Sequence, residues 1–175
     1  MTKVKRIFQL AQENADAYGI FEAKRSGSGD TYTKEVVDHL KFLAIMEMGP
    51  GVANQFLSNE NRQCVDFWIE EEHTIVSIEL NMFSSSPLLE KESFKALLAK
   101  DSGRDVRSLV LIGDPGAVRR HQVPTARSIM DWMERQHHIR VLIWELHDLG
   151  RVDSDNWENS RRKKTKLNPG SAQGA

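Results

Sequence analysis

Residues 64–83 of this 175-residue chain read CVDFWIEEEHTIVSIELNMF. Apolar residues alternate with other residues on both sides of the central EEHT segment, and a period of two is typical of strands that are apolar on one face. Because only four residues separate the two runs, we expect them to pair as an antiparallel hairpin. The stretch therefore predicts a hairpin whose apolar face lies on a hydrophobic core.

The register of this hairpin predicts how its acidic residues are arranged. If Glu71–Thr74 form the loop, antiparallel pairing places Asp66 opposite Glu79, with Asn81 on the same face. Facing residues have Cβ atoms about 4.5–5.5 Å apart, and two carboxylates at that separation repel unless a cation lies between them. We therefore expect a metal ion between Asp66 and Glu79.

An Asp on one strand followed by Glu-x-(polar) on the next resembles the motif of the PD-(D/E)XK nuclease superfamily. The matching residues are Asp66 and the segment Glu79-Leu80-Asn81, and the chain has Asn81 where the family usually has Lys and Val65 where the motif name has Pro. The resemblance covers roughly residues 30–146. It implies an α/β fold of the restriction-endonuclease type, with a central mixed β-sheet flanked by helices and, in this chain, an extra N-terminal helix.

The resemblance also implies an activity. Asp66 and Glu79, with Glu35 from the preceding helix, would bind Mg²⁺ or Mn²⁺ for phosphodiester hydrolysis, and the expected partner is nucleic acid, DNA in the first place. Asn81 can orient water but supplies neither a positive charge nor a titratable base. Three interpretations stay open: an active endonuclease, a catalytically inactive nuclease-fold module that binds nucleic acid or a protein, and an α/β protein of unrelated function with a polar edge.

A lysine on the helix after the hairpin offers a replacement for the missing ammonium. We expect this helix to run from about Ser86 to Lys100, so that the acid-bearing strand leads directly into it. Lys91, and with less weight Lys95, borders the side of the helix expected to be buried. Lysines at such a border usually extend their charge into water, which is the competing interpretation. The expected buried residues are Phe94, Leu97 and Leu98.

The C-terminal half predicts a strand, a helix and a strand. The apolar runs at 106–112 and 139–146 flank a segment with helical spacing at 124–138, as in a right-handed crossover between two buried parallel strands. A Gly-Asp-Pro-Gly turn after the first strand leads into three basic residues that are candidates for contact with a nucleic-acid backbone, or else a solvated loop. These residues are Arg119, Arg120 and His121.

The ends of the chain differ in composition from its middle. Residues 1–24 contain a predicted amphipathic helix at 2–18, which either docks on the main domain or forms a homodimer with a second copy. The nuclease-like domain is expected at 30–147. Residues 148–175 form a polar and basic segment, including the run Arg161–Lys166, for which we predict a disordered tail that could bind nucleic acid without specificity.

Composition excludes several classes of protein. The net charge of −1 means that any contact with nucleic acid must be local. The single cysteine, Cys64, cannot form an internal disulfide, and no apolar run approaches the roughly 18 residues of a membrane span. We therefore expect a cytoplasmic protein without a membrane segment.

Overall fold

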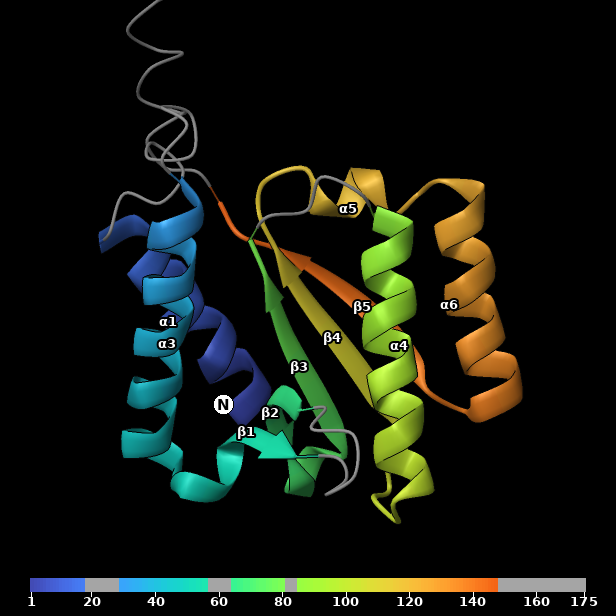
Figure 1. Cartoon of the computed structure of the whole chain (residues 1–175), viewed down its shortest axis with the longest axis horizontal. Helices are drawn as coiled ribbons and strands as arrows, with labels where there is room; N and C mark the ends of the chain where they lie inside the picture. Colours follow the sequence, from blue (N-terminus) through green and yellow to red (C-terminus); the bar gives the residue numbers. More distant parts are fainter. Residues whose placement is uncertain (18–28, 57–63, 81–84, 148–175) are drawn as a thin grey trace, which may run out of the picture.

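A five-stranded mixed sheet forms the middle layer of the protein in a computed structural model that describes residues 1–17, 29–56, 64–80 and 85–147. The strands lie in the order of the sequence, β1-β2-β3-β4-β5 (Figure 1). The first three are antiparallel neighbours, and the last three run parallel to one another. The strands are β1 (Ala53–Phe56), β2 (Cys64–Ile69), β3 (Thr74–Glu79), β4 (Ser108–Gly113) and β5 (Arg140–Glu145).

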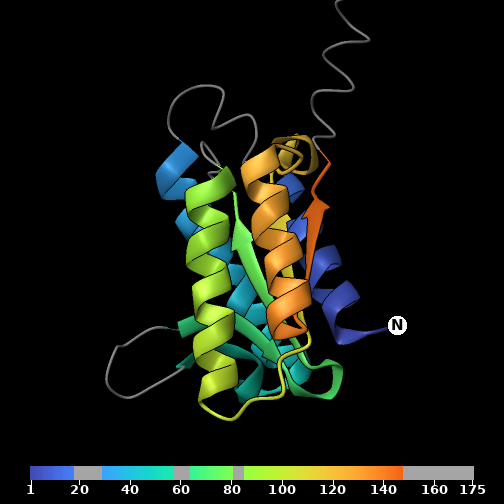
Figure 2. The same ribbon diagram turned by 90° about the vertical axis from the view of Figure 1, so that its right-hand side faces the viewer.

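Helices cover both faces of this sheet. One face carries α1 and α3, and the other carries α4 and α6, which lie side by side in front of the sheet in Figure 2. Their bounds are α1 (Lys3–Ala17), α3 (Gly29–Met48), α4 (Ser85–Asp101) and α6 (Pro124–His137), with short helices η1 (Pro50–Val52), η2 (Glu70–Glu72) and α5 (Ala117–Arg120). The predictions of an α/β fold, a mixed sheet flanked by helices and an additional N-terminal helix are confirmed.

The core has two layers because the central strands are apolar on both faces. Val76 and Ile78 of β3 pack with α1 and α3, whereas Ile75 packs with α4 and α6. Strand β4 divides in the same way, as expected for a parallel strand covered on both sides. Both faces of these strands are buried. The alternation in the sequence therefore separates the residues of one buried face from those of the other.

The predicted hairpin register is wrong by two residues. The structure pairs Ile69 with Thr74 and Phe67 with Val76, so Asp66 does not lie opposite Glu79. The cause is the loop, since η2 closes it as a 3-10 turn and His73 adopts a left-handed conformation with φ 50°. A shift of one residue would have turned Glu79 to the other face, whereas a shift of two keeps it on the same face as expected.

The buried side of α4 also differs from the prediction. Phe94 is 57% exposed, and Leu97 and Leu98 are only partly buried. Apolar residues lie all around this helix, so their spacing does not define one stripe. Most of the buried side chains are small or polar, and short side chains let a helix approach its neighbours closely. They are Leu89, Glu92, Ser93, Ala96 and Ala99.

Helix α1 docks on its own domain, which confirms the first of the two interpretations of the N-terminal segment. Ile7 is fully buried in the layer between α3 and the sheet. Phe8 meets Trp144 of β5 edge to face, with ring centroids 5.5 Å apart. Gln12 donates to the carbonyl of His147 at 2.8 Å and accepts from its amide at 2.7 Å. The apolar stripe that could have joined two copies is thus covered within one chain.

None of the described helices combines the length and the apolar character that a membrane span requires. The predicted tail at 148–175 lies outside the described residues.

Replacing Ile7 with Ala tests the docking of α1. The substitution should lower the free energy of unfolding by about 2–4 kcal/mol, because it leaves a cavity in a fully buried position. Urea denaturation measures this change, with Lys5→Ala on the exposed side of the same helix as the control. A midpoint that rises with protein concentration would instead show that the helix is stabilised by a second chain.

Candidate active site

Strands β2 and β3 part at Asp66, and the opening between them is the centre of the candidate site. Their backbone pairing extends from the hairpin to Phe67 and Val76. Just beyond, the carboxylate of Asp66 accepts hydrogen bonds from the amide of Ile78 at 3.1 Å and the hydroxyl of Ser77 at 3.3 Å. The side chain of Asp66 thus accepts a hydrogen bond from the backbone of β3 just beyond the last backbone pair of the two strands.

The alternation of β2 breaks at the same residue. Val65 packs in the layer of α4 and α6, whereas Phe67 and Ile69 pack in the layer of α1 and α3. A regular strand would place all three on one face. The strand therefore turns at Asp66, which brings this carboxylate between the two layers of helices.

A lysine from α3 pairs with Asp66 in the opening. The ammonium of Lys41 lies 2.7 Å from Oδ1 of Asp66, and the two side chains are only 13% and 21% exposed. Lys41 follows Leu40, which is buried on the inner side of α3. The pair joins α3 to the sheet with a charge-assisted contact.

Glu79 ends β3 on the α4 side of the opening. The observed register makes it a diagonal neighbour of Asp66, a relation in which Cα atoms are typically about 7–8 Å apart. Its Oε1 lies 3.7 Å from the ammonium of Lys91 on α4, and its side chain is 22% exposed. The wider spacing leaves room for a cation or an ammonium beside each carboxylate.

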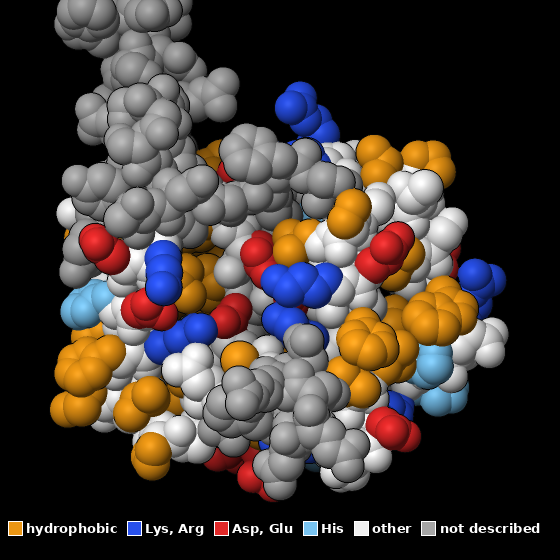
Figure 3. Space-filling model, in the orientation of Figure 1, with side chains coloured by type: hydrophobic (Ala, Val, Ile, Leu, Met, Phe, Trp, Pro, Cys, Tyr) orange, Lys and Arg blue, Asp and Glu red, His pale blue; other side chains and the backbone are white. Residues whose placement is uncertain are grey.

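A third acid, Glu92, lies behind these residues. It is fully buried, and its Oε1 is 3.4 Å from the ammonium of Lys91 and 2.8 Å from that of Lys95. Its other oxygen, Oε2, is buried without a hydrogen-bond partner among the described residues. The cluster thus joins three acids, Asp66, Glu79 and Glu92, with three lysines, Lys41, Lys91 and Lys95. Figure 3 shows acidic and basic side chains intermingled on this side of the molecule, between α3 and α4.

The electrostatics of the cluster favour a protonated Glu79. Burial raises its pKa to about 7, the negative charge of Glu92 acts in the same direction, and the nearby Lys91 only partly offsets them. For Lys91, burial alone would lower the pKa, but the charges of Glu79 and Glu92 outweigh it and raise the pKa. Lys91 therefore stays charged at neutral pH, while Glu79 can exchange a proton there.

The sequence-predicted acids and lysine come together in part. Glu79 pairs with Lys91, while Asp66 pairs with Lys41 and lies near enough for its charge to act on Glu79 and Lys91. Glu35 is exposed on α3, and no hydrogen bond or ion pair among the described residues joins it to these acids. Asn81 lies outside the described residues.

The predicted basic cluster divides into three different environments. Arg119 is exposed. The guanidinium of Arg120 pairs with Asp114 and donates to the carbonyl of Pro115 at 3.2 Å. His121 is buried, with Nδ1 2.8 Å from the carbonyl of Ala117. Arg120 and His121 thus hold the turn after β4, and Arg119 is the member available to a ligand.

Sequence reasoning missed Lys41 and Glu92. Glu92 follows Leu89 by three residues and precedes Ala96 by four, so all three share one face of α4. A charge on a buried helical stripe is a signal of a paired or functional group. The signal was hidden because Phe94, Leu97 and Leu98 suggested a different buried side for this helix.

The donor set fits a hard divalent cation in its chemistry. Mg²⁺ and Mn²⁺ prefer oxygen ligands, and Mg²⁺ in proteins commonly uses one or two carboxylates together with water. No group of three or more His, Cys, Asp or Glu among the described residues is arranged to hold a metal ion. Two carboxylates and the unpartnered Oε2 of Glu92 are therefore what the described part of the site offers.

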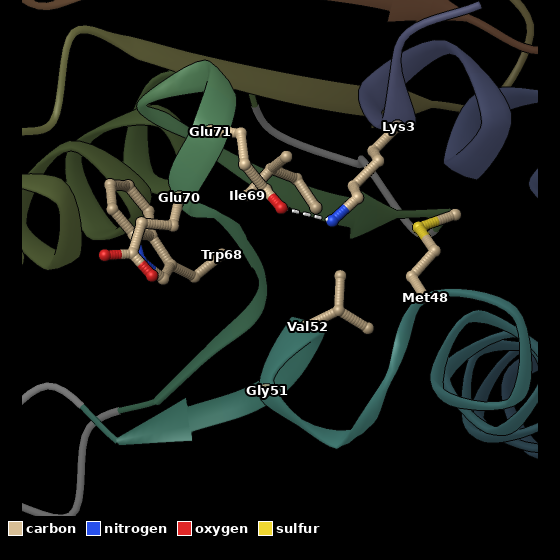
Figure 4. A pocket seen from close by; sticks show the side chains of 8 residues that line it. All are labelled: Lys3, Met48, Gly51, Val52, Trp68, Ile69, Glu70 and Glu71. Carbon is tan, nitrogen blue, oxygen red and sulfur yellow. Dashed lines mark hydrogen bonds and ion pairs between the residues drawn. The ribbon is translucent and has the colours of Figure 1, made fainter.

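Two hollows on the surface lie away from this cluster. One of about 160 Å³ lies beside the hairpin loop, at the other end of β3, where Lys3 pairs with Glu71 across its mouth (Figure 4). The other, of about 440 Å³, lies where α4 and α6 end, next to Lys100 and His137. Neither is lined by an acid or a lysine of the cluster.

Comparisons of the chain with protein-family models, with curated proteins and with solved structures gave no match. A function for this chain must therefore be inferred from the geometry and chemistry of its own residues.

The raised pKa of Glu79 predicts a pH-dependent stability in the absence of metal. The folded state holds a proton on Glu79 that the unfolded state releases near its ordinary pKa of 4.5, so stability is greatest below that pH and falls as the pH rises to about 7. The loss should approach ~3 kcal/mol by pH 8 and should be absent in Glu79→Gln. Urea denaturation in EDTA from pH 5 to pH 8 measures it. Equal pH profiles for the two proteins would show that Glu79 titrates normally.

Proposed function

We propose that this chain is a nuclease of the PD-(D/E)XK type that depends on Mg²⁺ or Mn²⁺, with Lys91 replacing the lysine of the motif. The observation that carries the proposal is the ion pair of Glu79 with Lys91 close to Asp66, whose charge acts on both of them. Two acids and a fixed positive charge are what the resembled motif requires, and here the charge comes from the helix that follows the second acid.

The arrangement of the elements supports the same proposal. An antiparallel β1-β2-β3 unit is followed by α4, β4, α6 and β5, with β3, β4 and β5 parallel. This is the order that the resemblance to the restriction-endonuclease-like fold implies. Glu79 also ends β3 at the carboxyl edge of the parallel strands, where open α/β sheets commonly bind ligands.

The residues have separable roles in the proposed reaction. Asp66 and Glu79 hold the cation, which when bound supplies a Lewis acid and a water of lowered pKa. Hydrogen bonds from Ile78 and Ser77 fix the carboxylate of Asp66, so its orientation is set before the substrate binds. Lys91 remains an ammonium, because its pKa is raised, and it therefore stabilises negative charge on the phosphate and does not act as a base. The substrate is nucleic acid, with DNA the first to be tested.

Cleavage of nucleic acid tests the proposal directly. Purified protein with Mg²⁺ or Mn²⁺ should cut plasmid, single-stranded DNA or RNA, and cutting should stop in EDTA. Asp66→Ala combined with Glu79→Ala should reduce the rate to background, and Lys91→Met should lower it by about 10²–10³ because it removes a charge that acts in the transition state. Gel electrophoresis of end-labelled substrates measures the rates.

The matched controls are Lys34→Met on α3 and Glu90→Gln on α4, both exposed. These should cut at the wild-type rate. Cleavage that persists in the double acid variant would come from a contaminating enzyme or from another site, and the proposal would then fail.

A second function is favoured by the balanced charges of the cluster. Lys41 neutralises Asp66, and Lys91 and Lys95 neutralise Glu79 and Glu92 without any metal. Such a cluster is stable in a catalytically inactive module that binds nucleic acid or a protein partner, the role suggested by Asn81. In that case DNA should bind without being cut, and binding should weaken steeply as salt increases.

Arg119 is exposed and does not hold the turn after β4, so a substitution there tests the binding surface alone. Arg119→Ala should weaken DNA binding by a few fold and reduce the salt slope by about one, since it removes one phosphate contact. Arg127→Ala, an exposed change on α6, is the control. Fluorescence anisotropy at several salt concentrations measures both, and an unchanged salt slope would place the contact elsewhere.

A further inference from the structure

Lys91 lies between two carboxylates that come from different elements. Its ammonium is 3.7 Å from Oε1 of Glu79, at the end of β3, and 3.4 Å from Oε1 of Glu92, on α4. A positive charge is thus held where two negative side chains converge. Such a position is also where a divalent cation would gain the most from the two carboxylates.

Glu92 is not satisfied by the lysines alone. Both ammonium groups approach the same oxygen, Oε1, while Oε2 is buried and without a hydrogen-bond partner among the described residues. A buried carboxylate oxygen without a partner is costly, because it has lost its water and gained nothing in return. Oε2 of Glu92 is therefore an acceptor that neither lysine uses.

We propose that Glu79 and Glu92 form a divalent-cation site, that the cation displaces the ammonium of Lys91 from between them, and that the released Lys91 contacts the phosphate of the substrate. The cation site is independent of nuclease activity, whereas the last step rests on the proposed function.

The exposure of the residues allows this exchange. Lys91 is 59% exposed, so its side chain can swing into water without losing buried contacts, and a cation from solution can enter by the same route. Lys95 is only 12% exposed and stays with Glu92. Two carboxylates with water completing the shell are sufficient for Mg²⁺ or Mn²⁺.

Binding of the cation makes the site more positive, which favours contact with the negatively charged backbone of a nucleic acid. With both carboxylates ionised, Glu79, Glu92, Lys91 and Lys95 together carry no net charge, and a divalent cation then makes the group doubly positive. A neutral site becomes one that attracts a phosphodiester. Lys91 thus blocks the cation site before metal binds and supplies a phosphate contact afterwards.

Binding of Mn²⁺ to the full chain without nucleic acid tests the inference. Electron paramagnetic resonance counts free Mn²⁺ for the wild type, Lys91→Met, Glu92→Gln and the exposed control Glu90→Gln. Lys91→Met should bind Mn²⁺ on the order of five- to tenfold more tightly, because it removes the competing ammonium. Glu92→Gln should bind at least about tenfold more weakly, and Glu90→Gln should match the wild type.

The variants also separate this inference from the proposed function. Unchanged or weaker binding in Lys91→Met overturns the exchange, and since Lys91 is exposed this variant should fold even if Glu92→Gln does not, which circular dichroism checks. Absence of Mn²⁺ binding in every variant overturns it too. If Asp66→Asn alone abolishes both Mn²⁺ binding and cleavage, the nuclease proposal stands and this site falls. If Mn²⁺ binds as inferred but no nucleic acid is cut, the cation site is supported and the nuclease proposal fails.

Discussion

The carboxylate of Asp66 at the opening of the sheet is the contact on which the site depends. It accepts hydrogen bonds from Ile78 and Ser77 of β3 and pairs with Lys41 of α3. Removing it would leave a backbone amide and a largely buried ammonium without their acceptor, a loss that commonly costs several kcal/mol. Asp66 therefore keeps β2 and β3 apart and at the same time holds α3 at the edge of the opening.

Because the backbone pairing ends there, side chains from four elements come close together. Asp66 comes from β2, Glu79 from β3 and the lysines from the helices on either side. An unbroken ladder would have continued the backbone pairing of β2 and β3 past these residues. At Asp66 the strand departs from regular pairing, which the alternation in the sequence does not predict. Such departures are typical of functional positions.

Much of the fold follows from periodicity, while the site depends on details that periodicity does not contain. The alternation in residues 64–83 gives the hairpin, and the apolar runs at 106–112 and 139–146 give the parallel strands. The register was missed because the four-residue loop is 70–73 and not 71–74, a choice that depends on the 3-10 turn and on the backbone geometry at His73. Asp66 and Glu79 were still placed on one face, since an error of two residues preserves the face.

The position of α4 explains why Glu92 could not be foreseen. A helix with apolar residues all around it has several plausible buried sides, and the packing against α6 and the sheet selects the one with Ala96 and Ala99. That choice buries Glu92, which does not stand out in the sequence, beside Lys95. Small residues therefore determined the electrostatics of the site, because they fixed which charges the helix turned inward.

The cluster satisfies one electrostatic requirement in two ways. Three carboxylates close together must be neutralised, and either ammonium groups or a divalent cation can do so. Lysines of different exposure make the two arrangements interconvertible: Lys41 and Lys95 are buried enough to remain, while Lys91 is free to leave. In the proposed exchange, the ammonium that pairs with Glu79 in the absence of metal is the one that the metal displaces. Under the proposed function, Lys91 on α4 supplies the positive charge that Asn81 does not.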